Sequence, residues 1–105
     1  MRIAVTYENG EIYGHFGHSE QFKIYDIEDG KIQKYEVVDT SESGHGALAD
    51  FLSNADVDIV ICGGIGSSAQ IALSNAGIKL YAGITGNADD AVAKLLAGEL
   101  EQMPQ

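Results

Sequence analysis

This sequence is short of basic residues and of long apolar runs. Six lysines and arginines stand against sixteen acidic residues, which gives a formal net charge of −10. So negative a chain repels the phosphate backbone of nucleic acid and the surface of an acidic membrane, and both are set aside as partners. No apolar run approaches the roughly 20 residues that cross a bilayer. The N-terminus also lacks the apolar stretch of a signal peptide, so we expect a cytoplasmic protein.

Cysteine and proline are nearly absent, with one residue of each. A single cysteine cannot form an internal disulfide, so nothing in the sequence calls for an oxidising compartment. Glycine, by contrast, occurs 13 times in 105 residues, and 45% of the chain is hydrophobic. This composition predicts one globular domain over residues 1–105, built from short elements that tight turns connect.

The first forty residues favour antiparallel strands. β-branched and aromatic residues are frequent in three segments, and the pairs Asn9-Gly10 and Asp29-Gly30 are typical of two-residue hairpin turns. The short apolar pair Ile12-Tyr13 follows the first turn. The expected strands are residues 2–7, 21–28 and 31–39.

From residue 47 onward the pattern alternates between helix and strand. The spacing of apolar residues predicts helices, the continuous apolar runs predict buried strands, and Asn87 is a suitable N-cap for the last helix. Ser67 or Ser68 is the expected cap of the helix before it. The predicted order is β-β-β-α-β-α-β-α, a three-layer α/β/α domain with a mixed five-stranded sheet. The expected elements are a helix at 47–54, a strand at 58–62, a helix from 67 or 68 to 75, a strand at 78–82 and a helix at 87–97.

Four residues with soft or borderline metal-ligand side chains lie in loops or at a strand end. His15 and His18 flank Phe16-Gly17, His45 lies between two glycines, and Cys62 ends an apolar strand. Imidazole and thiolate are ligands for iron and other transition metals, so all four are candidate metal ligands. Each also has a structural interpretation: a surface histidine, a neighbour of a helix cap, or a small buried hydrophobic residue.

The loop after Cys62 is rich in glycine and leads into a helix. Backbone N–H groups of Gly63, Gly64 and Gly66 could hold an anion beside that helix N-terminus. The loop lacks the lysine of a P-loop, and no acidic residue ends the next strand to bind a ribose. A small-molecule or nucleotide site, or a regulatory interaction domain, that uses residues 63–68 is therefore the alternative function.

Few residues suggest catalysis. The expected central strands carry no carboxylate pair for two-metal chemistry, and nothing fixes a base and an orienting partner beside Cys62. We therefore do not expect an enzyme.

With these segments in view, the chain resembles the dinitrogenase iron–molybdenum cofactor biosynthesis family, in particular its stand-alone members. The resemblance implies a ribonuclease H-like fold without nuclease carboxylates. It also implies that the protein binds or carries an iron–sulfur or iron–molybdenum cluster, or its precursor, between donor and acceptor proteins. His15, in the His-Phe-Gly motif, is the residue to which the resemblance assigns the cofactor. The matching segments are His15-Phe16-Gly17-His18-Ser19, Ser43-Gly44-His45-Gly46, Cys62-Gly63-Gly64-Ile65-Gly66, Ala76-Gly77-Ile78 and Gly98-Glu99-Leu100.

Overall fold

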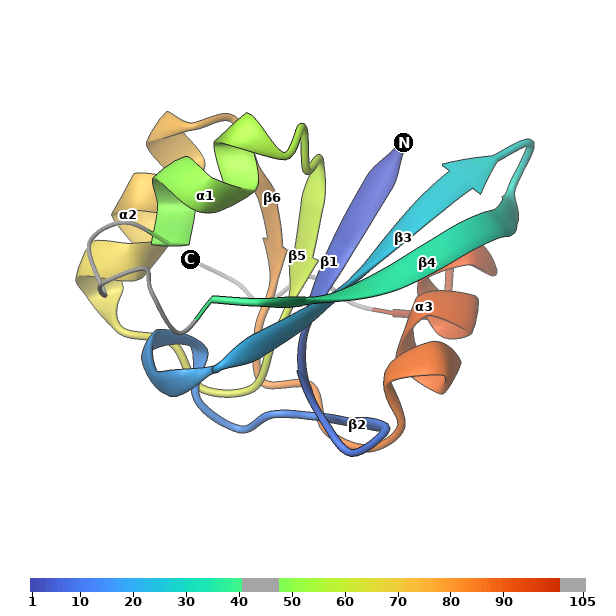
Figure 1. Cartoon of the computed structure of the whole chain (residues 1–105), viewed down its shortest axis with the longest axis horizontal. Coiled ribbons are helices and arrows are strands. Elements are labelled where there is room, and N and C mark those ends of the chain that lie inside the picture. Colours follow the sequence, from blue (N-terminus) through green and yellow to red (C-terminus); the bar gives the residue numbers. More distant parts are fainter. Residues whose placement is uncertain (41–47, 101–105) are drawn as a thin grey trace.

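A computed structural model of the chain describes residues 1–40 and 48–100. Its elements follow the predicted order, with a two-residue strand and a 3₁₀ turn added near the N-terminus (Figure 1). The strands are β1 (Arg2–Glu8), β2 (Glu11–Ile12), β3 (Gln21–Glu28), β4 (Lys31–Asp39), β5 (Ile59–Ile61) and β6 (Lys79–Tyr81). The helices are the 3₁₀ turn η1 (Phe16–His18), α1 (Leu48–Asn54), α2 (Ser67–Asn75) and α3 (Ala88–Leu96).

One mixed sheet forms the centre of the molecule. Its main strands lie in the order β4-β3-β1-β5-β6, and the short β2 pairs with β1. β3 runs antiparallel to both of its neighbours, whereas β1, β5 and β6 are parallel. The predicted mixed α/β sheet and its five main strands are therefore confirmed, with β2 as a short sixth strand, and the topology is ribonuclease H-like.

The two predicted hairpin turns have the backbone that their sequences favour. Asn9 and Gly10 have φ values of 50° and 89°, and Asp29 and Gly30 have 54° and 74°. Positive φ at both central residues is the mark of the type I′ turn, which matches the twist of the flanking strands. These turns fix where β1 and β3 end.

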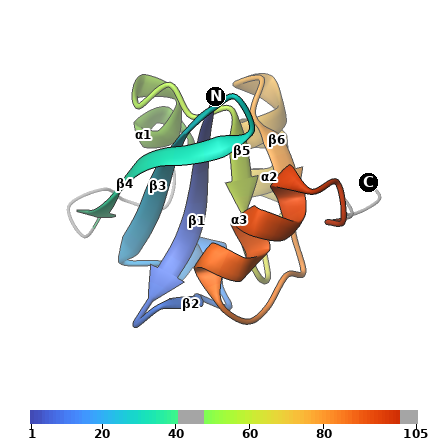
Figure 2. The ribbon, with the colours of Figure 1, turned by 90° about the vertical axis from the view of Figure 1, so that its right-hand side faces the viewer.

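Alternate residues of the central strands face two different helical layers. Ala4 and Val60 pack towards α1 and α2, whereas Ile3, Val5 and Ile61 pack towards α3. Figure 2 shows α3 on one side of the sheet and α1 and α2 on the other. The sheet is therefore covered on both faces, as the continuous apolar run of β5 predicts.

Of the two predicted helix N-caps, the one for α3 is confirmed and the one for α2 is wrong. Asn87 caps α3 as expected, because its side chain accepts a hydrogen bond of 3.0 Å from the Asp90 N–H. The expectation that Ser67 or Ser68 caps α2 is wrong: the N-cap is Gly66, which has no side chain to form a cap hydrogen bond. Of the helices within residues 1–40 and 48–100, none is long and apolar enough to cross a membrane.

Candidate functional site

Two glycine-rich loops meet at the carboxyl edge of the parallel strands. The Phe16 N–H donates to the Gly64 carbonyl, and the Gly64 N–H donates to the Gly14 carbonyl, each at 2.8 Å. His15 and Gly64 thereby form an isolated parallel bridge outside the main sheet. The bridge ties the segment that carries His15 and His18 to the loop that follows β5. Ligands of open α/β sheets bind at this edge of the parallel strands.

Gly63 is required because the two loops approach too closely for a side chain. A Cβ at this position would lie 2.8 Å from the Gly14 Cα and 3.0 Å from its carbonyl carbon. A Cβ at Gly64 would lie 3.2 Å from the Gly14 carbonyl oxygen. The glycines at 63 and 64 therefore serve the contact between the loops. The Gly64 N–H already donates to the Gly14 carbonyl. This bond occupies an amide that the sequence suggests as a donor to a ligand.

The η1 turn holds two histidines at the surface and one phenylalanine in the core. Phe16 is 2% exposed and packs edge-on against Phe22, with ring centroids 5.8 Å apart. His15 and His18 are both exposed, and their ring centroids lie 4.6 Å apart with the planes inclined at 61°. The buried phenylalanine anchors the turn and so presents the two imidazoles together. The structure thus brings these two candidate ligands together at the surface.

A cavity of about 340 Å³ opens beside the two histidines. It lies between η1, the first turn of α1 and the face of α2 that carries Ala69 and Ala72. Figure 1 shows α1 and α2 side by side. Three alanines leave this space open, since larger side chains at their positions would fill it. The lining residues are His15, Phe16, Gly17, His18, Ala49, Gly66, Ser68, Ala69 and Ala72.

Cys62 is not among the residues that line this cavity. The residue is fully buried within the core cluster under α1 and α2. Burial raises the pKa of the thiol to about 12, which disfavours the thiolate form that binds metals. The thiol is a small core hydrophobe in this structure. Strand alternation explains its direction, because Cys62 shares the face of Val60.

The remaining predicted residues divide between the cavity, the loop contact and an undescribed segment. Gly66 lines the cavity, whereas Gly63 and Gly64 form the contact between the loops. His45 lies outside the residues that the structure describes. Within residues 1–40 and 48–100, no three His, Cys, Asp or Glu side chains gather closely enough to hold a metal ion.

Sequence reasoning missed the part of the cavity that the helices supply. Ala49 in α1 and Ala69 and Ala72 in α2 contribute much of its wall, with Ser68 at the first turn of α2. The available signal was the small size of residues that face η1. That signal is weak without the fold, because alanine is also a common helix residue.

A larger hollow of about 640 Å³ lies at the opposite end of the sheet, but Arg2 and two of the carboxylates that line it are already paired. Arg2 Nε donates to Asp26 at 2.6 Å, and the Arg2 N–H donates to Asp58 at 2.8 Å. The hydrogen bond from Arg2 and its charge hold the pKa of the Asp26 carboxyl below its usual range. The histidine-lined cavity is therefore the better candidate, despite its smaller volume.

The fold and this cavity define a ribonuclease H-like α/β domain with a histidine-lined pocket at the carboxyl edge of its parallel strands. The chain matches the family model described as dinitrogenase iron–molybdenum cofactor over residues 1–98, and it belongs to that family. The resemblance found in the motifs is therefore confirmed.

Three relatives show how closely the chain follows the family. An uncharacterized protein of Methanocaldococcus jannaschii is 33% identical over 107 residues, which span 97% of this chain and 91% of the relative. The crystal structure of the protein PH0822 is 30% identical with a TM-score of 0.90, and the match covers 97% of this chain and 94% of that one. The apo form of the orange protein from Desulfovibrio gigas is 29% identical with a TM-score of 0.87, covering 97% and 92%.

Proposed function

We propose that this protein binds and carries a metallocluster of the iron–sulfur or iron–molybdenum type, or its precursor, without catalysing a reaction. The cavity beside η1 receives the cluster, and His15 is its principal ligand, with His18 as a second. Donor and acceptor proteins in the cytoplasm would load and unload it. The observation that carries the proposal is the pair of exposed imidazoles, 4.6 Å apart, at a cavity of about 340 Å³.

The donor set suits a preassembled cluster better than a bare metal ion. A bare transition-metal ion needs several protein ligands, but a cluster brings its own sulfides and needs only one or two further donors. Among the described residues that line the cavity, His15 and His18 supply imidazole donors. Membership of the iron–molybdenum cofactor family and the existence of an apo form of the orange protein also support a bound cargo.

The N-terminus of α2 gives the cavity a local positive electrostatic potential, which suits an anionic cargo. α2 begins at Gly66 without a side-chain cap and has no acidic residue in its first turn. α3, in contrast, carries Asp89 and Asp90 in its first turn. Because a helix N-terminus is the positive end of the helix dipole, the cavity offsets part of the repulsion that a chain of net charge −10 exerts on a negative cluster.

Anaerobic reconstitution with iron and sulfide, with and without molybdate, tests the proposal. We expect the unaltered protein to retain iron after desalting and to show charge-transfer absorbance in the visible range. His15→Ala removes the principal ligand, so cluster affinity should fall about tenfold or more. His18→Ala should weaken binding less.

Cys62→Ala is the control for loss of a potential ligand outside the cavity, because the thiol is buried in the core. It should leave iron retention and the spectrum unchanged. Retention of iron by His15→Ala at the level of the unaltered protein would reject His15 as the ligand. Failure of the unaltered protein to hold any iron would reject cluster binding itself.

The uncapped N-terminus of α2 also supports one alternative, a small phosphorylated ligand or nucleotide held by residues 63–68. Phosphate oxygens accept hydrogen bonds from free N–H groups at such a helix end. A thermal-shift comparison separates the two functions, because a ligand that binds only the folded state raises Tm. A rise in Tm with nucleotides, together with no rise after cluster reconstitution, would favour this alternative.

A further inference from the structure

β4 is a long, exposed strand at the edge of the sheet. It is the terminal strand in the sheet order, and all nine of its residues are exposed except Val38, which is half-buried. Ile32, Tyr35 and Val37 are 39%, 63% and 43% exposed, and they belong to a small group of large apolar side chains in the described chain that face solvent to this degree. An unprotected edge of this kind presents unpaired backbone groups to another strand.

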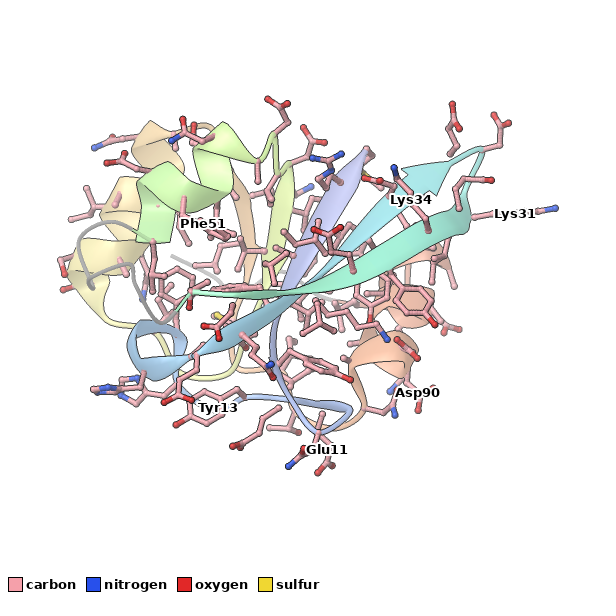
Figure 3. The ribbon with its side chains drawn as sticks, in the orientation of Figure 1. Glu11, Tyr13, Lys31, Lys34, Phe51 and Asp90 are labelled. Atoms are coloured by element: carbon pink, nitrogen blue, oxygen red, sulfur yellow. The ribbon has the colours of Figure 1, made fainter. Side chains whose placement is uncertain are left out.

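The charge on β4 differs from the charge on the rest of the protein. Lys31 and Lys34 balance Glu36 and Asp39, so the strand is electrically neutral within a chain of net charge −10. Figure 3 shows Lys31 extending from the outer end of the β3–β4 hairpin. Two copies of so acidic a chain repel each other over most of their surfaces. On the neutral β4 strand this repulsion is weaker.

The sequence of β4 is self-complementary when two copies run antiparallel around Tyr35. In that register Lys34 of each copy lies opposite Glu36 of the other, and the two Tyr35 residues meet at the two-fold axis. Lys34 and Glu36 lie on the same face of the sheet, because they pair with Asp26 and Ile24, two residues apart on β3. Opposite charges in cross-strand positions stabilise a sheet, and like charges destabilise it.

Moving the two-fold axis by one residue, from Tyr35 to Glu36, slides the two strands past each other by two residues and removes this complementarity. Pairing centred on Glu36 would place Glu36 opposite its own copy, which is a like-charge contact. A β-bulge between the pairs of Asp26 and Ile27 ends the regular part of β4 at Lys34, so the favourable pairing is short. The contact is therefore that of a weak dimer that forms only at high protein concentration.

We propose that β4 pairs antiparallel with β4 of a second copy of this chain, in the register that sets Lys34 against Glu36, and so joins two sheets across a two-fold axis. The three exposed apolar residues Ile32, Tyr35 and Val37 lie near that junction. This association does not depend on the cavity beside η1 or on any cargo.

Complementary charge variants test the register. Lys34→Glu sets acidic residues against each other in a homodimer, and Glu36→Lys sets lysines against each other. Each variant alone should have a dissociation constant about tenfold higher than the unaltered chain in sedimentation equilibrium. An equimolar mixture of the two variants restores opposite charges at every cross-strand position, so it should form heterodimers at least as readily as the unaltered chain forms homodimers.

Lys94→Glu is the matched control, since it changes the net charge as Lys34→Glu does but lies on α3. It should leave the dissociation constant within about twofold of the unaltered value. Circular dichroism of each variant checks that it remains folded. A chain that stays monomeric at millimolar concentration would overturn the proposal. A mixture of the two variants that associates no better than either alone would also overturn it.

Discussion

At the scale of single residues, the candidate site depends on a contact between two backbone segments at glycines, which have no side chains. Gly63 and Gly14 bring two loops within backbone contact, and the bridge between His15 and Gly64 follows from that approach. The histidine segment comes after β2 and the Gly63 loop comes after β5, so their contact links distant parts of the sequence. The residues that hold the cavity open are thus different from the residues that would bind a cargo.

Gly63→Ala should destabilise the protein and disturb the cavity. Its Cβ would lie 2.8 Å from the Gly14 Cα, so the loops must separate, and an overpacking cost of about 1–3 kcal/mol is expected. Gly14→Ala is the control, because a Cβ there meets nothing within 4 Å. Urea unfolding measures both free energies. Equal stability of the two variants would show that the contact is not as close as described.

The positions of Cys62 and of the two histidines could be predicted from the sequence only in part. The sequence placed Cys62 at a strand end, and strand alternation with Val60 then directs it into the layer beneath α1 and α2. That direction could have been predicted from the parity of the strand. The closeness of His15 and His18 follows from their spacing on a turn. Their position beside Ala69 could not be predicted, because it depends on how α2 packs.

At the scale of elements, strands and helices with local signals were the most predictable. Asn-Gly and Asp-Gly specify the turns that end β1 and β3, and Asn87 specifies the start of α3, because short polar side chains and glycine favour these conformations locally. The sequence does not predict the start of α2, because Ser67 and Ser68 are the better N-cap residues by type, but the fold places the cap at Gly66. The contact of η1 with the Gly63 loop has no local signal and comes only from the fold.

An ion pair between the sheet and a helix fixes the position of α3. Lys23 of β3 has a side chain that is only 9% exposed, and its ammonium donates to Asp89 of α3 at 2.8 Å. Three tyrosine rings surround the same ammonium, with centroids 4.3 to 5.6 Å away. The Tyr25 hydroxyl also donates to Asp89. Removal of the carboxylate would leave a nearly buried cation without its anionic partner.

Asp89→Asn should therefore lower the stability of the protein at pH 7. Because Asp89 is 61% exposed and partly screened by solvent, the expected loss is about 1–2 kcal/mol rather than the larger cost of a fully buried pair. Asp90→Asn, in the same turn of α3, is the control and should cost less than about 0.5 kcal/mol. Urea unfolding of the two variants side by side measures the difference.

The cost of Asp89→Asn should also depend on pH. The hydrogen bond from Lys23, followed by that from Tyr25, holds the pKa of Asp89 below its usual value of 3.8. A lowered pKa in the folded state contributes stability above the usual pKa, and the contribution is lost as pH falls through the folded pKa. The difference between Asp89→Asn and the unaltered chain should therefore shrink below about pH 4. A difference that stays constant down to pH 2 would assign the effect to packing.

At the scale of the whole molecule, the net charge of −10 opposes both folding and the approach of an anionic cargo. The basic side chains are few, and three of them, Arg2, Lys23 and Lys34, are already paired with carboxylates in the folded protein. The proposed cavity and the proposed dimer strand are the places where the structure relieves this charge. Near η1 relief comes from the positive N-terminal end of α2, and on β4 it comes from equal numbers of lysines and acids.

Salt should therefore stabilise this protein. Screening weakens the repulsion among its acidic residues, while the few partly exposed ion pairs lose little, so repulsion is the larger of the two effects. Between about 10 mM and 300 mM sodium chloride, the free energy of unfolding should rise by about 1 kcal/mol. Lys94→Glu, which adds negative charge on α3, should respond more steeply. Potassium chloride should give the same curve, because the effect is one of ionic strength; a fall in stability with added salt would mean that the ion pairs at Asp26 and Asp89 outweigh the repulsion.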